Sequence, residues 1–177
     1  MAGPGNLFLI GMMGAGKTTV GRLLARRLRL RFFDCDHEIE RRCGVKVPTI
    51  FDIEGESGFR LRESQTLAEL TALDDIVLAT GGGAVLAEEN RRCLAARGTV
   101  AYLCARPEEL YERVRHYRNR PLLATGDPLA RLRDLHAQRD ALYRGIADVV
   151  IDSGRLSIQA VTRTLAEELA QRWKASA

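Results

Sequence analysis

A glycine-rich stretch near the N-terminus carries the most specific chemistry in this sequence. It runs from Gly11 to Thr18 as G-M-M-G-A-G-K-T and fits the nucleotide-binding pattern G-x-x-x-x-G-K-[ST]. Glycines let successive backbone N–H groups point inward and let phosphate oxygens approach closely. Lys17 is expected to reach the β- and γ-phosphates, and the Thr18 hydroxyl is expected to ligate Mg²⁺. The residues predicted to bind the nucleotide here are Gly14, Ala15, Gly16, Lys17, Thr18 and Thr19.

An acidic pair, Asp34 and Asp36, follows the next short apolar run. Two carboxylates at this spacing, close to a metal ion and a phosphate, can divide the work between them. One can hold the metal and its water while the other accepts a proton from a substrate hydroxyl or orients it. Asp36 is also well placed to cap the helix that follows, so a purely structural role stays open at this point.

Three consecutive glycines, Gly81, Gly82 and Gly83, follow a third apolar run. Motor ATPases usually carry a metal-binding aspartate at a comparable strand end, and this sequence has none there. The metal ligands are therefore expected to be Thr18 and Asp34. Three bare glycines also indicate that some group approaches the backbone closely. The absence of an N-K-x-D motif argues against a GTPase.

Three arginines, Arg60, Arg120 and Arg139, are candidates for binding anions, although most arginines on helices are solvated surface residues. Arg120 precedes Pro121 in an irregular segment, about 117–126, that we predict to be a mobile lid. Closure of such a lid over the γ-phosphate would deliver a charge that is worth about 10³–10⁵ in rate.

The elements that must position these residues alternate between strands and helices. Apolar runs predict strands at 7–10, 31–34, 76–79, 100–103 and 149–151, with helices between them, including separate helices at 48–56 and 57–73. Such alternation indicates an α/β fold with a parallel sheet wound on both faces. Ligands bind beyond the carboxyl ends of the strands in such a sheet, which is where the candidate residues lie.

Composition fits a single domain spanning all 177 residues, with a net charge of +4 that suits an anionic partner. Aromatic residues are only 6% and the arginines are dispersed, so no nucleic-acid partner is expected.

No apolar run approaches the roughly 20 residues of a membrane span, and no signal peptide is evident, which predicts a cytoplasmic protein without a membrane partner. The spacing of Cys35, Cys43, Cys93 and Cys104 indicates reduced thiols rather than a zinc site. We expect a monomer.

These motifs, taken in order, resemble those of the shikimate kinase family over nearly the full length. They are G-M-M-G-A-G-K-T at 11–18, D-C-D at 34–36, F-D-I-E-G-E-S-G-F-R at 51–60, A-T-G-G-G-A-V at 79–85, R-P-L-L at 120–123 and R-D-A-L-Y at 139–143. The resemblance implies a P-loop three-layer α/β/α fold like that of nucleoside monophosphate kinases, with a five-stranded parallel sheet of order 2-3-1-4-5. It also implies transfer of the γ-phosphate of ATP, with Mg²⁺, to the 3-hydroxyl of shikimate.

The resemblance also assigns roles to individual residues. It implies that Asp36 contacts the hydroxyl, that Asp34 lies nearer the metal, and that helices at about 36–73 bind the substrate. Arg60 and Arg139 would hold the substrate carboxylate, with a backbone contact from Gly82. The residues that resemble nucleotide contacts are Arg120 in the lid and Arg113 and Arg155 near the adenine.

Two alternatives stay open at this point. One is another small-molecule kinase of the same architecture, such as a gluconate or nucleotide kinase. The other is a non-catalytic nucleotide-binding domain, although the intact Lys17, Thr18, Asp34 and Asp36 argue against it.

Overall fold

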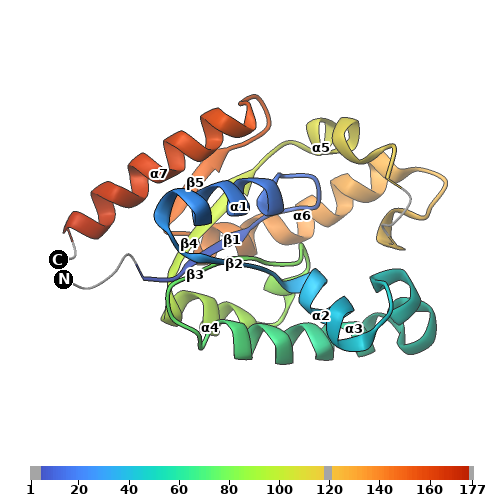
Figure 1. Cartoon of the computed structure of the whole chain (residues 1–177). Coiled ribbons are helices and arrows are strands. Elements are labelled where there is room, and N and C mark those ends of the chain that lie inside the picture. Colours follow the sequence, from blue (N-terminus) through green and yellow to red (C-terminus); the bar gives the residue numbers. More distant parts are fainter. Residues whose placement is uncertain (1–4, 118–120, 176–177) are drawn as a thin grey trace.

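Five parallel strands form the centre of the computed structural model, which describes residues 5–117 and 121–175 (Figure 1). The order across the sheet is β2-β3-β1-β4-β5, which confirms the predicted order. β1 and β3 are buried along their whole length, as expected for apolar strands that are covered on both faces. The strands are β1 (Leu7–Ile10), β2 (Arg31–Asp34), β3 (Ile76–Ala79), β4 (Thr99–Cys104) and β5 (Val149–Asp152).

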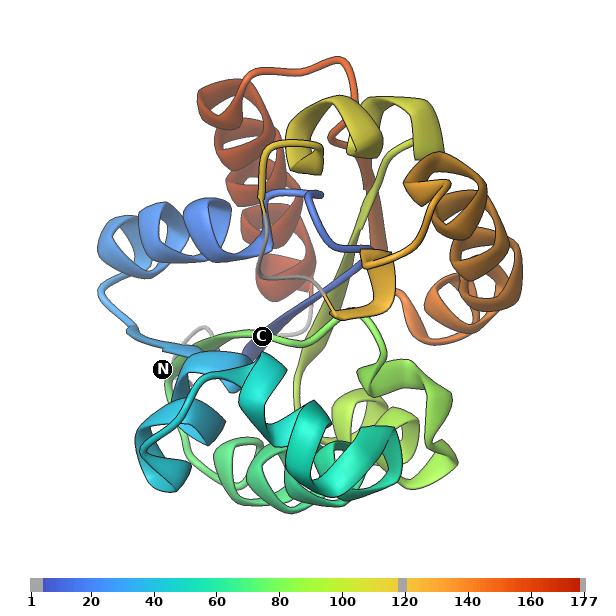
Figure 2. The ribbon, with the colours of Figure 1, turned by 90° about the vertical axis from the view of Figure 1, so that its right-hand side faces the viewer.

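Helices cover both faces of this sheet and complete the predicted three layers. They are α1 (Lys17–Leu28), α2 (Cys35–Cys43), α3 (Val47–Leu70), α4 (Glu88–Arg97), α5 (Pro107–Val114), α6 (Pro128–Ile146) and α7 (Ile158–Ala175). α1 and α7 pack together on one face, while α4 and α6 pack on the other. At the carboxyl ends of the strands, α5 and the chain before α6 face α2 and α3 across the end of the sheet (Figure 2).

The region between β2 and β3 differs slightly from the prediction of two separate helices. α3 runs from Val47 to Leu70 but is interrupted at Gly55, whose φ of 70° and ψ of −179° are not helical. The break therefore lies within one or two residues of the predicted boundary. Phe59, Leu67 and Leu70, all in the second half of α3, are buried. They fix the second half of α3 against the core, so that its polar face is held toward the end of the sheet.

Two short 3₁₀ turns occur outside the main helices. The chain makes one turn at Ala84–Leu86, directly before α4 begins at Glu88. The other, at Pro121–Leu123, lies within the predicted lid. In the described ranges, no helix is long and apolar enough to cross a membrane.

Candidate active site

The phosphate loop connects β1 to α1 in the geometry that its sequence predicts. Gly14 and Gly16 have φ angles of 81° and 97°, in the left-handed region that favours glycine. The Lys17 ammonium folds over the loop and donates to the carbonyl oxygens of Gly11 at 2.7 Å and Met12 at 2.8 Å. The loop forms one wall of a cavity of about 630 Å³. The positive end of α1 faces this cavity, an arrangement suited to an anion.

Asp34 joins β2 and α2 to the phosphate loop. Its carboxylate accepts a hydrogen bond from the Thr18 hydroxyl at 2.6 Å and another from the backbone N–H of His37 at 3.1 Å. The second bond makes Asp34 the N-cap of α2. The alternative that Asp36 caps this helix is therefore wrong, because the extended backbone that a cap requires occurs at Asp34, with φ −117° and ψ 123°.

Asp36 lies in the first turn of α2, where two cavities adjoin. The second cavity, of about 330 Å³, lies between α2–α3 and the chain before α6. The residues that line both cavities are Met13, Asp36, His37, Gly81, Gly82 and Tyr117. A molecule in the second cavity would therefore lie beside Asp36 and close to whatever occupies the phosphate loop.

The three glycines at the end of β3 each lie against a charged side chain. A Cβ at Gly81 would overlap the carboxylate of Glu63, and one at Gly83 would overlap the guanidinium of Arg60. A Cβ at Gly82 would lie 3.4 Å from Arg139 Nη1. None of the three has a positive φ, so it is close approach rather than backbone conformation that requires glycine here. This confirms the prediction that other groups approach this backbone closely.

Two arginines, Arg60 and Arg139, line the second cavity with different electrostatic surroundings. Arg60 forms ion pairs with Glu63 at 2.8 Å and Glu56 at 3.1 Å. Arg139 is only 2% exposed, and no carboxylate of the described residues lies within ion-pair distance of it. Burial lowers the pKa of Arg139, and the nearby Arg60 cation lowers it further. A buried guanidinium without an acidic partner is costly, which indicates an anionic ligand.

Glu63 is fully buried beneath Gly81. Burial raises the pKa of its carboxyl group, and the cation of Arg60 opposes that effect. One oxygen, Oε2, accepts from Arg60, whereas Oε1 has no hydrogen-bond partner among the described protein atoms. Glu63 therefore anchors the guanidinium of Arg60, a residue that lines the second cavity.

Only some of the other residues predicted to bind the nucleotide line the first cavity, which contains the phosphate loop. Arg113 lines it and donates to the carbonyl oxygens of Gly14 and Ser153, so it ties α5 to both the phosphate loop and the chain after β5. Arg155 has a 71% exposed side chain 3.8 Å from Glu109 and does not line the cavity. Ala15 is buried in the loop and does not line it either. Arg120 lies outside the described residues.

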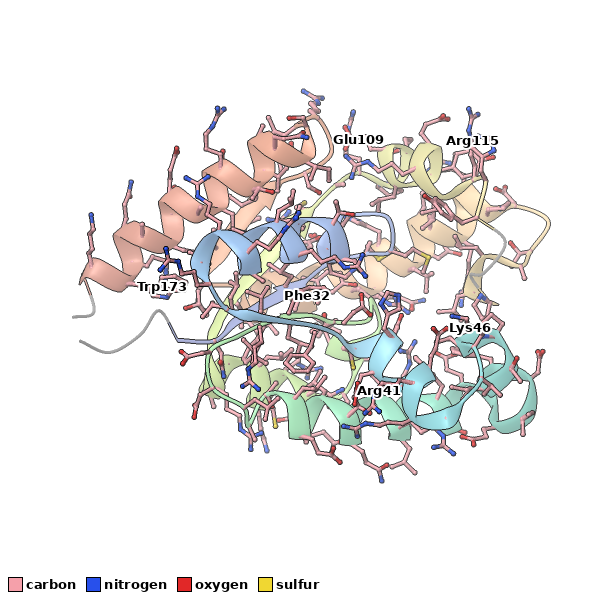
Figure 3. The ribbon with its side chains drawn as sticks, viewed as in Figure 1. Phe32, Arg41, Lys46, Glu109, Arg115 and Trp173 are labelled. Carbon is pink, nitrogen blue, oxygen red and sulfur yellow. The ribbon has the colours of Figure 1, made fainter. Side chains whose placement is uncertain are left out.

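Several residues in the walls of the cavities or directly behind them were not singled out from the sequence. Glu63 lies three residues after Arg60, and Tyr143 four residues after Arg139, so helical spacing alone places each beside its arginine. Lys46 lies on the side of the molecule where α2 and α3 approach the chain before α6 (Figure 3). It pairs with Glu40 at 3.2 Å. Residues 156–158, rather than Arg155, complete the first cavity after β5.

The fold and the paired cavities together define a class of protein. A phosphate loop on a 2-3-1-4-5 parallel sheet, beside a smaller cavity that Arg60 and Arg139 line, defines a P-loop kinase that acts on a small anionic acceptor. A model of the shikimate kinase family matches residues 13–170. The chain belongs to the shikimate kinase family.

Relatives and solved structures agree with this assignment. The shikimate kinase of Thiobacillus denitrificans is 61% identical over 160 residues, which are 90% of this chain and 87% of that protein. The structure of shikimate kinase from Acinetobacter baumannii in complex with shikimate has a TM-score of 0.92 and 45% identity, covering 94% of this chain and 93% of that one.

A gluconokinase from Sinorhizobium meliloti bears on the alternative of another small-molecule kinase. It is similar with a TM-score of 0.63, but its sequence is only 16% identical, over 97% of this chain and 94% of its own. Identity this low shows a shared fold and nothing further.

Proposed function

We propose that this protein transfers the γ-phosphate of ATP to the 3-hydroxyl of shikimate, with Asp36 at the junction where the two substrates meet. The observation that carries the proposal is the placement of Asp36 in the walls of both cavities. One cavity contains the phosphate loop, and the other contains two arginines suited to a carboxylate. Membership of the shikimate kinase family supports the choice of acceptor.

The acceptor carboxylate is proposed to bind between Arg139 and Arg60, with a backbone contact from Gly82. An anion there would neutralise the buried charge of Arg139, which has no acidic partner among the described residues. Two guanidinium groups can hold a carboxylate through several parallel hydrogen bonds and so fix its orientation. A carboxylate oriented in this way would leave the hydroxyls of the same molecule free to reach Asp36, which lines the same cavity.

Asp36 is proposed to act on the attacking hydroxyl, either by accepting its proton or by orienting it. In phosphoryl transfer, positioning and electrostatic stabilisation provide most of the catalysis. Lys17 supplies a fixed positive charge at the phosphate loop. Arg120, by virtue of its place in the predicted lid, is proposed to add a second charge when the lid closes.

Thr18 and Asp34 fit a nucleotide-bound Mg²⁺. Their side-chain oxygens lie 2.6 Å apart and line the phosphate cavity, and Mg²⁺ prefers few protein oxygens together with water and phosphate. No group of three or more acidic, histidine or cysteine side chains suited to a metal occurs in the described ranges, which fits an ion held largely by the nucleotide. When bound, the ion would neutralise charge on the phosphates.

The proposal predicts that shikimate is the preferred acceptor. Release of ADP is measured in a coupled assay with shikimate, quinate, gluconate and AMP under identical conditions. The cavity with two arginines is suited to a compact carboxylate, and membership of the shikimate kinase family points to shikimate. The kcat/KM measured with shikimate should therefore exceed the value for each of the other acceptors. Faster turnover of gluconate or AMP would contradict the proposal.

Arg139→Lys should raise the KM for shikimate about 10–100-fold, the range expected when hydrogen bonds to a charged group are lost. A lysine keeps the charge but not the planar pair of donors. The KM for ATP should change little. Arg60→Lys should act in the same direction, but less strongly, because Glu63 and Glu56 already share its charge.

Arg133→Lys provides the matched control, since Arg133 is an exposed residue of the same helix and pairs with Glu108. A shikimate analogue without the carboxylate should bind the wild-type protein poorly and lose little more in Arg139→Lys. Equal losses for both acceptors would exclude the carboxylate role.

A further inference from the structure

The fold places a buried tyrosine, Tyr143, behind the proposed carboxylate site. Tyr143 is one turn after Arg139 on α6, so both side chains lie on the same face of the helix. It is completely buried, and its hydroxyl donates to the carbonyl oxygen of Gly82 at 2.5 Å. Tyr143 does not line either cavity. Any effect on the acceptor must therefore pass through the residues that it contacts.

Tyr143 remains a neutral phenol under all ordinary conditions. Burial raises its pKa to about 12, and the adjacent Arg139 cation only partly opposes this. Because the phenol keeps its proton, it can donate to Gly82, and its oxygen interacts with the Arg139 guanidinium, which also lies beside Gly82. One hydroxyl thus contacts two of the three groups that are proposed to bind the acceptor carboxylate.

Gly82 is the group most in need of such a constraint. It lies in a run of three glycines, which have the greatest backbone freedom, and it packs between Arg139 and the backbone nitrogen of Met13. A hydrogen bond to its carbonyl oxygen also fixes the plane of the following peptide, because peptide groups are planar. Binding groups held in place before the ligand arrives lose less entropy when it binds.

The ring of Tyr143 is held in turn by Tyr102 of β4. The two rings stack with centroids 4.8 Å apart and an interplanar angle of 29°. The Tyr102 hydroxyl donates to Asp140 at 2.8 Å, and Asp140 lines neither cavity. Both rings of the stacked pair are therefore buried, and both hydroxyls are hydrogen-bonded. Only the Tyr143 hydroxyl bonds a group of the proposed carboxylate site.

We propose that Tyr143 is a positioning residue that fixes Gly82 and Arg139 in the arrangement that receives the acceptor carboxylate. The inference rests on the proposed function and extends it to a residue behind the cavity wall. The aromatic ring of Tyr143 stabilises the core, whereas its hydroxyl orders the binding site.

Tyr143→Phe tests the role of the hydroxyl, with Tyr102→Phe as the matched control. Tyr143→Phe should raise both the Kd and the KM for shikimate about tenfold, as expected for one lost hydrogen bond and a loosened partner. Its KM for ATP should stay within about twofold of the wild-type value. Tyr102→Phe loses an equivalent hydroxyl from the same stack, so it should melt at a similar temperature but keep the wild-type KM for shikimate.

Replacement of Tyr143 by 4-aminophenylalanine gives a second test that keeps the ring and a donor at the same position. It should restore the wild-type KM for shikimate, and a raised KM would overturn the inference even if Tyr143→Phe failed to fold. An unchanged Kd for shikimate in folded Tyr143→Phe, or equal changes in Tyr102→Phe, would also overturn it. If the wild-type protein did not phosphorylate shikimate at all, the proposed function itself would fail.

Discussion

Lys17→Ala is expected to lower kcat about 10²–10³-fold, the usual effect of removing one fixed electrostatic donor from a transition state. Lys17 is 9% exposed, and its ammonium is held by the carbonyl oxygens of Gly11 and Met12 at the phosphate cavity. Its position is thus set by the loop before any nucleotide binds. Charge that builds on the transferred phosphate would meet a cation already in place.

The fold should survive this change, because the Lys17 ammonium bonds carbonyl oxygens of the phosphate loop at the cavity, and these lie outside the strands of the sheet. The measurement is steady-state turnover with ATP and shikimate, together with thermal unfolding. Lys174→Ala, at an exposed position near the end of α7, is the control and should behave like the wild-type protein. Near-native turnover of Lys17→Ala would show that the loop does not stabilise the transferred phosphate.

The sequence predicts most of the fold because the determining signals are local. Buried parallel strands such as Ile76–Ala79 are short, continuous apolar runs, and each leads into a glycine-rich turn or a helix start. The phosphate loop is equally local, since Gly16, Lys17 and Thr18 act at fixed spacing. The ends of helices are harder to predict where two helical geometries compete, as at Ala84–Leu86, which forms a 3₁₀ turn before α4.

The electrostatic partners in the site were harder to predict, because they depend on contacts distant in sequence. The sequence indicates that something approaches Gly81 and Gly83, but only the packing of α3 against the sheet shows that these groups are Glu63 and Arg60. Likewise, the burial of Arg139 cannot be read from a helix that also carries exposed arginines. The prediction that Asp36 could cap α2 was wrong by two residues, because an aspartate at either position can begin a helix and the sequence does not show which one has extended backbone.

Asp36→Asn is expected to reduce kcat about 10²–10⁴-fold, the range for loss of a general acid or base. The carboxylate lines both cavities, so it is placed where the acceptor hydroxyl would approach the phosphate. α2 should remain intact, because Asp34 rather than Asp36 accepts the capping hydrogen bond. Asp52→Asn, at an exposed position of α3 that lines neither cavity, is the control and should keep wild-type turnover.

A comparison of Asp36→Asn with Asp36→Ala separates the two roles proposed for this carboxylate. Asparagine still accepts a hydrogen bond from the acceptor hydroxyl, so it can orient the group, but it cannot take up the proton at ordinary pH. If proton transfer dominates, kcat should fall equally in both variants. If orientation dominates, Asp36→Asn should keep most of the activity that Asp36→Ala loses. Wild-type kcat in both variants, accompanied by a lower unfolding temperature, would instead assign Asp36 a structural role and remove it from the chemistry.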